Sequence, residues 1–383
     1  MYYRLFTSES VAAGHPDKVC DQISDAIVDA VYAQDPFGRV AVEALTTKNQ
    51  VVLAGEVTTK AEVDFATVAR EVIRSLGYTN NSFEFDDRSD VIVRIHQQSP
   101  EIAAGVDSGG AGDQGMMFGY AVRETPELMP LPIALAHRLT EAMDQARISG
   151  VLPFLRPDGK SQVTVEYDGL RPIEVTKVVL AVPHDPSLSN DDLTSALFEM
   201  VVIPTLGAYG YQVNRSNLIV NGTGVWHAGG PASDTGLTGR KIVVDGYGGM
   251  ARVGGGAFSG KDPTKVDRSG AYAARYLAKN IVSSGLAERC EVQLAYVIGH
   301  PSPIARAVET FGSATVGLDE IERHAWQLLD LSVKGIIAGL NLRQPIYRRT
   351  AAYGHFGRDG FPWEQVAIRE GVSREGVSNG ALS

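Results

Sequence analysis

The sequence predicts an α+β fold in which one order of elements, α-β-β-α-β, occurs three times along the chain. The first observation is that helical and strand-like hydrophobic patterns follow one another in this order between residues 17 and 96. The second is that the strands come in hairpin pairs, which places helices and antiparallel strands in separate layers. The third is that the sequence lacks the βαβαβ alternation of a dinucleotide-binding fold. We therefore expect three similar domains, at residues 1–99, 110–225 and 226–383.

The first helix is expected from Asp17 to Tyr32, because apolar residues recur there at helical spacing. Asp21, Asp25 and Asp29 lie four residues apart on another face of this helix. Such an acidic stripe is more typical of a solvated helix face than of a metal site.

Two strand-like runs follow this helix, VAVEALTT and QVVLAGEVTT, and Lys48-Asn49 joins them as a hairpin. A helix that ends near Gly77 and a strand at residues 90–96 complete the first set of elements.

The second and third sets repeat this order as a pattern only, without residue-level identity. The second set comprises a helix at 132–148, the strands SQVTVEY and IEVTKVVLAV, a helical run from residue 191 to about Pro204, and the short strand NLIV. The third set comprises a helix at 264–283, the strand CEVQLAYVIG, a strand at about 307–311, and the helix LDEIERHAWQLLDL. The boundaries fall in the glycine-rich segment 99–115 and in the turn cluster 222–230.

Composition limits the partners of the chain. With 383 residues and a net charge of -10, it is an acidic globular protein that repels nucleic acid. Cys20 and Cys290 are the two cysteines, and we expect both to be small core residues in a reducing compartment. No run approaches the ~20 apolar residues of a membrane span, and MYYRLFTSES does not resemble a signal peptide. We expect no nucleic-acid partner, no membrane span and a cytoplasmic location.

The stretch Gly255–Lys261 matches G-x-x-x-x-G-K, the phosphate-binding pattern of P-loop enzymes. Three features argue against a P-loop. Asp262 stands where a Ser or Thr hydroxyl is needed, Pro263 removes a backbone donor, and the residues before the glycines make a poor buried strand. The stretch therefore indicates a different phosphate site, in which lysines supply most of the charge.

Five basic residues gather in two short glycine-rich segments of this acidic chain. Arg240 and Lys241 stand at the mouth of an apolar strand predicted in GLTGRKIVVD, and Lys261, Lys265 and Arg268 stand close to a helix start. Surface lysines are common, but this arrangement beside glycine loops favours a polyphosphate pocket over a solvated face.

Three shorter motifs are ambiguous by themselves. GHPDK places His15 and Asp17 at the first turn of a helix, as an anion and hard-cation site or as a simple N-cap beside a loop histidine. GAGDQG exposes Asp113 and Gln114 on a tight backbone that turns alone would explain. In RPDGK, Lys160 follows a turn, where a lysine is usually only solvated.

Taken together, FTSESVAAGHPDKVCDQISDA, GAGDQG, the run from GLTGRK to SGAYAARY and TAAYGHFGR closely resemble the S-adenosylmethionine synthetase (methionine adenosyltransferase) family. The resemblance runs from about Leu5 to Trp363, and GAGDQG and GGGAFSGKD are similar to the family's two signature patterns. It implies three similar α+β domains around a pseudo-threefold axis, which agrees with the repeated pattern. It also implies a homotetramer, built as a dimer of dimers, with active sites shared between two subunits.

The reaction that the resemblance implies joins ATP and L-methionine into S-adenosylmethionine. The methionine sulfur attacks C5′ of ATP, and the tripolyphosphate that leaves is then hydrolysed to phosphate and diphosphate. A neutral thioether has no proton to lose, so no general base is needed. The reaction depends instead on aligned reactants and on positive charge around the leaving group.

The resemblance also implies roles for individual residues. It assigns the catalytic work, at the ATP phosphates, to His15, Lys160, Arg240, Lys241 and Lys261. It places on the rest of the ATP Asp113, Asp158, Val225, Trp226, Asp234 and, through its backbone, Ala257. It places on the methionine side Glu56, Gln98, Asp234, Lys265 and Ile298. It implies two Mg²⁺ ions per site, on Asp17 and Asp267, and K⁺ on Glu43.

Pattern alone would give some of these residues a plainer role. Glu43 and Glu56 would be polar-face strand residues, and Ile298 would be a core residue. Only the matched context makes them candidates for the site.

Two departures from the family pattern concern the pocket. The family usually has an Arg-Phe pair before GGP, where this chain has Val225-Trp226-His227-Ala228, so a larger ring would lie beside the methionine sulfur. The segment EIAAGVDSG, between Pro100 and Gly110, is shorter than the mobile loop that covers the family's active site. We expect altered tolerance of methionine analogues and altered closure of the site.

Two other functions remain open from the sequence. An ATP phosphohydrolase or phosphotransferase could use the same cations, and it would consume ATP without methionine. A catalytically silent partner subunit would be expected to have lost His15, Asp17, Lys160 or Lys261, and all four are present.

Overall fold

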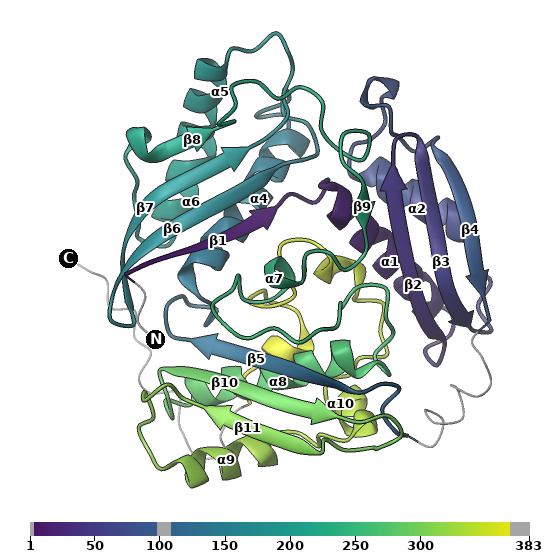
Figure 1. Cartoon of the computed structure of the whole chain (residues 1–383), viewed down its shortest axis with the longest axis vertical. Coiled ribbons are helices and arrows are strands. Elements are labelled where there is room, and N and C mark those ends of the chain that lie inside the picture. Colours follow the sequence, from purple (N-terminus) through teal and green to yellow (C-terminus); the bar gives the residue numbers. More distant parts are fainter. Residues whose placement is uncertain (1–3, 98–108, 368–383) are drawn as a thin grey trace.

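The computed structural model describes residues 4–97 and 109–367, and within them three sheets surround a common centre (Figure 1). The helices of each set pack on one side of its sheet. In Figure 1 the sheets lie toward the viewer. This arrangement of antiparallel hairpins and separate helices confirms the predicted α+β class.

The first sheet has the strand order β4-β3-β2-β9. Its strands are β2 (Arg39–Thr47), β3 (Gln50–Thr58), β4 (Asp90–His96) and β9 (Gly236–Leu237). The helices α1 (Pro16–Tyr32) and α2 (Phe65–Ser75) belong to the same set. The predicted hairpin joins β2 to β3, with Thr47 opposite Gln50 and a positive φ of 54° at Asn49.

The second sheet has the strand order β1-β6-β7-β8. Its strands are β1 (Leu5–Val11), β6 (Lys160–Asp168), β7 (Arg171–Ala181) and β8 (Leu218–Val220). Its helices are α4 (Leu131–Ile148), α5 (Asn190–Leu197) and α6 (Ile203–Gly207), and a π-helical turn at Phe198–Val202 joins the last two. The helical run predicted from residue 191 is therefore present, with a change of helix type in its middle.

The third sheet has the strand order β11-β10-β5. Its strands are β5 (Gly115–Val122), β10 (Arg289–Tyr296) and β11 (Ala305–Glu309). Its helices are α8 (Val266–Ser283), α9 (Leu318–Gln327) and α10 (Val333–Gly339). In the first two sets a parallel strand follows the second helix, whereas helix α10 takes that place in the third.

Each sheet contains one strand that comes from the segment before another set. Strand β1 precedes the first set but pairs with β6 of the second. Strand β5 precedes the second set but pairs with β10 of the third, and β9 precedes the third set but pairs with β2 of the first. These three exchanged strands link the sheets in a closed cycle, so each sheet depends on a segment of a different predicted domain. The boundaries at 1–99, 110–225 and 226–383 stay a prediction.

The acidic stripe of α1 is not a solvated face, and that prediction is wrong. Asp21 and Asp25 are each 0% exposed. Lys18 forms an ion pair with Asp21, and Arg268 forms one with Asp25. The carboxylates are therefore buried with counter-charges, as buried charges must be. Apolar residues such as Ile23 cover the other side of the helix, so α1 is buried almost all round.

The apolar strand predicted in GLTGRKIVVD is also wrong, because residues 242–245 form the short helix α7 (Ile242–Asp245). The Asp245 N–H donates to the Lys241 carbonyl at 2.8 Å, which closes a helical turn instead of a ladder. The Asp245 side chain then reaches the buried ammonium of Lys18. An apolar run as short as IVV has no period that distinguishes a helix from a strand.

Two observations relate to the composition of the chain. Cys20 and Cys290 are free and buried, as predicted. In the part of the chain that the structure describes, the helices are too short or too polar to span a membrane.

Candidate active site

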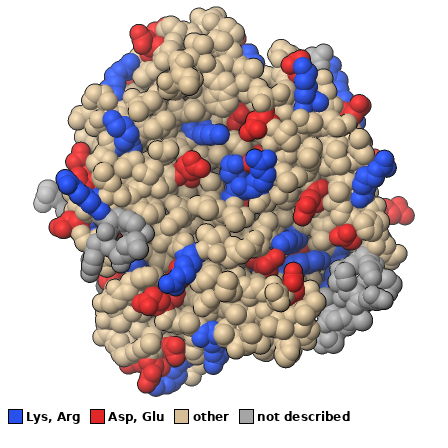
Figure 2. Space-filling model, in the orientation of Figure 1, with Lys and Arg blue, Asp and Glu red and all other residues tan. Residues whose placement is uncertain are grey.

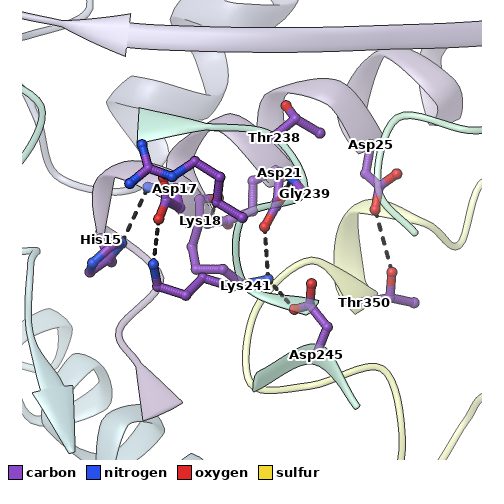
Figure 3. A network of polar contacts seen from close by, with 12 residues as sticks. His15, Asp17, Lys18, Asp21, Asp25, Thr238, Gly239, Lys241, Asp245 and Thr350 are labelled. Atoms are coloured by element: carbon purple, nitrogen blue, oxygen red, sulfur yellow. Dashed lines mark hydrogen bonds and ion pairs between the residues drawn. The ribbon is translucent and has the colours of Figure 1, made fainter. Parts of the chain in front are cut away.

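The first group of candidate residues surrounds the N-terminus of α1. His15 is the N-cap of this helix, and its Nδ1 accepts the Asp17 N–H at 3.2 Å (Figure 3). Burial, together with the charges of Lys241 and Lys160, lowers the pKa of His15 to about 3. His15 is therefore neutral at neutral pH. Because Nδ1 accepts a hydrogen bond, its proton lies on Nε2, which can donate.

Asp17 connects this helix end to the first pair of cations. Its carboxylate accepts the Leu237 N–H at 3.0 Å, forms a hydrogen-bonded ion pair with Lys241 and lies 3.6 Å from Arg240 Nε. Burial alone would raise the pKa of Asp17, but the hydrogen bonds from Lys241 and Leu237 outweigh that effect and lower it. Asp17 is thus an anion with Lys241 as its nearest counter-charge.

The turn before β6 adds a carboxylate and a cation to the first group. Asp158 is buried and accepts the N–H groups of Gly159 at 2.7 Å and Gly230 at 2.8 Å. Burial raises the pKa of Asp158 to about 6, although these hydrogen bonds oppose the rise. Lys160 starts β6 with an exposed side chain, as the sequence predicts. The charge of Asp234 also acts on Asp158, which places Asp234 near this group.

Val225 and Trp226 lie in the loop that leads to Gly230. Val225 is exposed, whereas Trp226 is half-buried. The Trp226 carbonyl accepts the His184 N–H at 3.0 Å, and its ring Nε1 donates to the Ala228 carbonyl at 2.6 Å. The indole that replaces the family's usual phenylalanine is thus held by a hydrogen bond that phenylalanine could not make.

The second group lines a cavity of about 590 Å³. Lys261 Nζ forms an ion pair with Asp267 Oδ2 at 2.6 Å in the wall of this cavity. The wall also includes four further residues that the sequence proposes for the site, namely Glu43, Glu56, Asp113 and Ala257. Glu43 alternates with the buried residues of β2, and Glu56 of β3 stands opposite Ala41, so both lie on the face of the first sheet opposite its helices.

Three of the predicted methionine-side residues lie elsewhere or cannot be placed. Lys265 Nζ binds the buried carboxylate of Asp262 at 2.5 Å and is not part of the cavity wall as far as the structure describes the chain. Ile298 forms an isolated β-bridge with Ala111 and has an exposed side chain. It too is absent from the described part of the cavity wall. Gln98 lies outside the described residues, as does most of the short segment between Pro100 and Gly110.

The five cations grouped from the sequence do not form one pocket in the described part of the chain. Of the five, only Lys261 lies in the described lining of the cavity, and Lys160 is absent from that lining as well. Arg268 is fully buried and paired with Asp25, so it is a structural cation rather than a ligand-binding one. The two groups attach to α1 at Asp17 and Asp25, which are eight residues or about 12 Å apart along the helix.

As the sequence predicts, the glycine-rich stretch GGGAFSGKD does not form a P-loop. Its residues 254–259 are irregular, and no strand of the described chain leads into it. Gly260 takes a φ of 81°, and the Lys261 backbone then forms a bridge to Ala41 of the first sheet. The loop is therefore fixed to β2 and presents its lysine beside Asp267.

Sequence reasoning missed the burial and pairing of the charges that support both groups. These charges are Lys18, Asp21, Asp25, Asp245 and Arg268. The spacing of four residues from Asp17 to Asp29 could have indicated them. Like charges at this spacing on a helix repel one another, so they call for counter-charges nearby.

Comparison with known proteins gives the family of this chain. Three family models match it in order, the N-terminal, central and C-terminal domains of S-adenosylmethionine synthetase, at residues 3–100, 108–226 and 228–365. The chain belongs to the S-adenosylmethionine synthetase family. The resemblance found in the sequence and the fold that it implied are thereby confirmed.

Relatives named S-adenosylmethionine synthase match this family member over nearly its whole length. The protein from Desulforudis audaxviator is 51% identical, with 98% of this chain and 100% of the relative covered. The proteins from Treponema denticola and Salinispora tropica are 50% and 53% identical, and each comparison covers 96% of this chain and 97% of the relative.

The carboxylates at the site fit divalent cations that a substrate helps to hold. No group of three or more His, Cys, Asp and Glu side chains is arranged to hold a metal ion in the described part of this family member. Asp17 and Asp267 each offer one hard carboxylate, now paired with a lysine. Mg²⁺ commonly binds one or two carboxylates together with phosphate oxygens and water, so this arrangement fits Mg²⁺ delivered with a polyphosphate.

Charge on the surface in Figure 2 is mixed rather than separated by sign. Basic and acidic side chains alternate across the face that the figure shows, and blue and red groups meet near its centre. A small anion at a local cluster suits this pattern better than a long nucleic-acid backbone.

Proposed function

We propose that this member of the family synthesises S-adenosylmethionine from ATP and L-methionine by attack of the methionine sulfur on C5′ of ATP. Tripolyphosphate leaves and is then hydrolysed to phosphate and diphosphate. The observation that carries the proposal is the pair of lysine–aspartate ion pairs, Lys241–Asp17 and Lys261–Asp267, each attached to a glycine loop. Such pairs can release their lysines to a polyphosphate while the carboxylates take up divalent cations.

The triphosphate is the group on which the catalytic residues act in this proposal. Lys160, Arg240, Lys241 and Lys261 neutralise the negative charge that grows as the bond from C5′ to oxygen breaks. His15 is neutral, and its Nε2–H can donate a hydrogen bond to the leaving oxygen without a change of charge. The attacking sulfur carries no proton, so these residues need only align the reactants and stabilise the leaving group.

The remaining assignments follow the family resemblance and the positions of the residues. Around the nucleotide we place Asp113, Asp158, Val225, Trp226, Asp234 and Ala257. On the methionine side we place Glu56, Gln98, Asp234, Lys265 and Ile298. In support, Asp113, Glu56 and Ala257 share a cavity wall with Lys261.

Metal ions complete the proposed site. Asp17 and Asp267 would hold two Mg²⁺ ions, and Glu43 would hold K⁺. Bound Mg²⁺ supplies positive charge to the phosphate oxygens. The lysines that now neutralise Asp17 and Asp267 would then turn to the phosphates.

We further propose that the working unit contains more than one copy of the chain, as a homotetramer built from two dimers. The support is that the two groups of candidate residues do not share one cavity within the described part of a single chain. A partner's second group, placed against the first group of this chain, would complete a polyphosphate site at the dimer interface. We propose a cytoplasmic location and no nucleic-acid partner.

Mass spectrometry of the products tests this proposal. The purified chain is mixed with ATP, methionine, Mg²⁺ and K⁺, and we expect S-adenosylmethionine together with phosphate and diphosphate. Phosphate release that does not depend on methionine would identify an ATP phosphohydrolase instead. Absence of any sulfonium product would contradict the proposal.

A further inference from the structure

One face of α1 binds the backbone of both cation-bearing loops. Four aspartates stand on this face at intervals of four residues, Asp17, Asp21, Asp25 and Asp29. The first three accept one backbone N–H each, from Leu237 at 3.0 Å, Gly239 at 2.8 Å and Gly260 at 2.8 Å. Figure 3 shows Asp21 and Gly239 lying together beside Lys18, with Asp25 further along the helix.

The glycines that Asp21 and Asp25 bind stand directly before the cations of the site. Gly239 precedes Arg240 and Lys241, and Gly260 precedes Lys261. Both glycines have a positive φ, of 79° and 81°. The hydrogen bond that each aspartate accepts therefore fixes its loop at the residue directly before the cation.

The space around both glycines is closely filled. A Cβ atom at Gly239 would lie 2.5 Å from the Cβ of Ala257, and one at Gly260 would lie 2.0 Å from the Val42 carbonyl oxygen. Such distances leave no room for the loops to shift toward these neighbours. The two loops also meet each other at Gly239 and Ala257, so a change in one bears on the other.

Counter-charges hold the two aspartates in place. Lys18 Nζ lies 3.0 Å from Asp21 Oδ2 and also binds Asp245, which follows the Arg240–Lys241 segment. Arg268 binds both oxygens of Asp25, at 2.6 and 2.7 Å, and donates to the Lys261 carbonyl at 3.0 Å. Asp25 thus holds the N–H of Gly260, the residue before Lys261, and Arg268 holds the carbonyl of Lys261 itself. The contacts among these side chains are buried, and the contact from Arg268 to the Lys261 carbonyl is partly buried, so the network holds both loops firmly.

We infer that Asp21 and Asp25 are positioning residues: Asp21 holds the loop of the Arg240–Lys241 pair, and Asp25 holds the loop of Lys261, each at a fixed place on one rigid helix. The inference rests on the proposed function, because it assigns these cations to the polyphosphate. Asp21 and Asp25 touch no substrate. They act through the backbone of the residues that do.

Asp29 provides a matched control on the same helix face. It is the next aspartate in the series, and it accepts the N–H groups of Tyr347 at 2.8 Å and Arg348 at 2.9 Å. Those residues are not among the candidates for the site. Asp29→Asn therefore weakens similar backbone contacts on the same helix, since asparagine keeps one of the two acceptor oxygens, and it leaves both cation loops untouched.

The experiment compares Asp21→Asn, Asp25→Asn and Asp29→Asn in the full-length chain. Three quantities are measured: the thermal unfolding midpoint, kcat and KM for ATP in S-adenosylmethionine formation, and the affinity for inorganic tripolyphosphate with Mg²⁺. We expect larger losses of thermal stability in Asp21→Asn and Asp25→Asn, which remove a counter-charge from the buried Lys18 and Arg268, than in Asp29→Asn. Only Asp21→Asn and Asp25→Asn should lower kcat and tripolyphosphate affinity, each by about tenfold or more, since small misplacements of charged groups have large effects.

Two results would overturn the inference. One is kcat and tripolyphosphate affinity in Asp21→Asn and Asp25→Asn within about twofold of those of Asp29→Asn. The other applies if Asp21→Asn fails to fold. Ser24→Ala then removes the 2.8 Å contact between the Ser24 and Thr238 hydroxyls, which ties the loop before Arg240 to α1. If Asp25→Asn fails to fold, Asp21→Asn decides alone. Unchanged tripolyphosphate affinity in Ser24→Ala would count against positioning, and a reduced affinity would support it.

Failure of the proposed function is a separate outcome. If the unaltered chain makes no S-adenosylmethionine, the proposed function fails. The tripolyphosphate affinities of the same variants still decide whether Asp21 and Asp25 position the cations. If the unaltered chain makes S-adenosylmethionine while the variants match Asp29→Asn, the inference alone fails.

Discussion

The two groups of candidate residues use the same device in different surroundings. The first group, around Asp17 and Lys241, lies at a buried helix end with the neutral His15. The second group, around Asp267 and Lys261, lines an open cavity on the face of the first sheet. The first group suits the leaving oxygen, and the second adds carboxylates for cations and for methionine. This difference is what we expect if, as proposed, the two groups are halves of one site contributed by two copies of the chain.

The largest expected effect comes from removing the cation of the second group. Lys261→Ala should lower turnover by at least ~10²-fold, as removal of other charge donors to a transition state does. Lys48→Ala provides the control, because Lys48 pairs with Glu84 at the exposed β2–β3 turn of the same sheet. The rate of S-adenosylmethionine formation is measured for both. Unchanged turnover in Lys261→Ala would remove Lys261 from the mechanism.

A smaller effect should come from the backbone of the second group. Gly260→Ala places a Cβ 2.0 Å from the Val42 carbonyl oxygen at a φ of 81°. We expect it to lower the free energy of unfolding by about 2 kcal/mol. Gly255→Ala in the same stretch is the matched control, because a Cβ there meets no described atom within 4 Å. Equal stability of the two variants in denaturant titrations would show that the loop is not fixed to β2.

The first group should make stability depend on pH through His15. The pKa is 6.5 for an ordinary histidine and about 3 for His15 in the fold. Between these values the unfolded chain binds a proton that the folded chain does not, so the free energy of unfolding falls as pH is lowered from 6.5 toward 3. One such histidine contributes a slope of up to about 1.4 kcal/mol per pH unit.

His15→Gln tests this slope directly. The variant should lose stability less steeply than the unaltered chain as pH falls from 6.5. Denaturant unfolding at several pH values measures both slopes. The same slope in both chains would mean that His15 is protonated in the folded state.

The smallest effect is expected at Trp226, beside the first group. Trp226→Phe removes the 2.6 Å hydrogen bond to the Ala228 carbonyl and reduces the ring. We expect a change of a few-fold in the preference for methionine analogues, and less change in KM for ATP, because shape differences in apolar pockets discriminate weakly. Competition assays with ethionine measure the preference. Equal changes for both substrates would count against a place beside the methionine sulfur.

Much of the fold could be predicted from the sequence, because its elements are set by local patterns. The period of apolar residues predicted α1, and the two strand-like runs on either side of Lys48-Asn49 predicted the hairpin of β2 and β3. The exchange of β1, β5 and β9 among the sheets could not be predicted. Strand pairing over such separations leaves no local signal, and β9 has only two residues.

The candidate site was predictable only in part for the same reason. Motifs identified the residues that can carry chemistry, such as His15 and Lys261. Their division between two groups depends on where distant segments meet α1. The burial of Asp21 and Asp25 also depends on partners, Lys18 and Arg268, and Arg268 lies 243 residues away from Asp25. A charge pattern shows that such residues share a helix face but not what covers that face.

Mixing two inactive variants tests most directly whether one site combines two subunits. Lys241→Ala damages only the first group, and Lys261→Ala damages only the second. In a mixed dimer the intact halves meet at one of the two sites, so co-expression of the two chains should restore about one quarter of the unaltered activity. Activity no greater than that of the separate variants would show that Lys241 and Lys261 of the same chain act together, and would contradict the account.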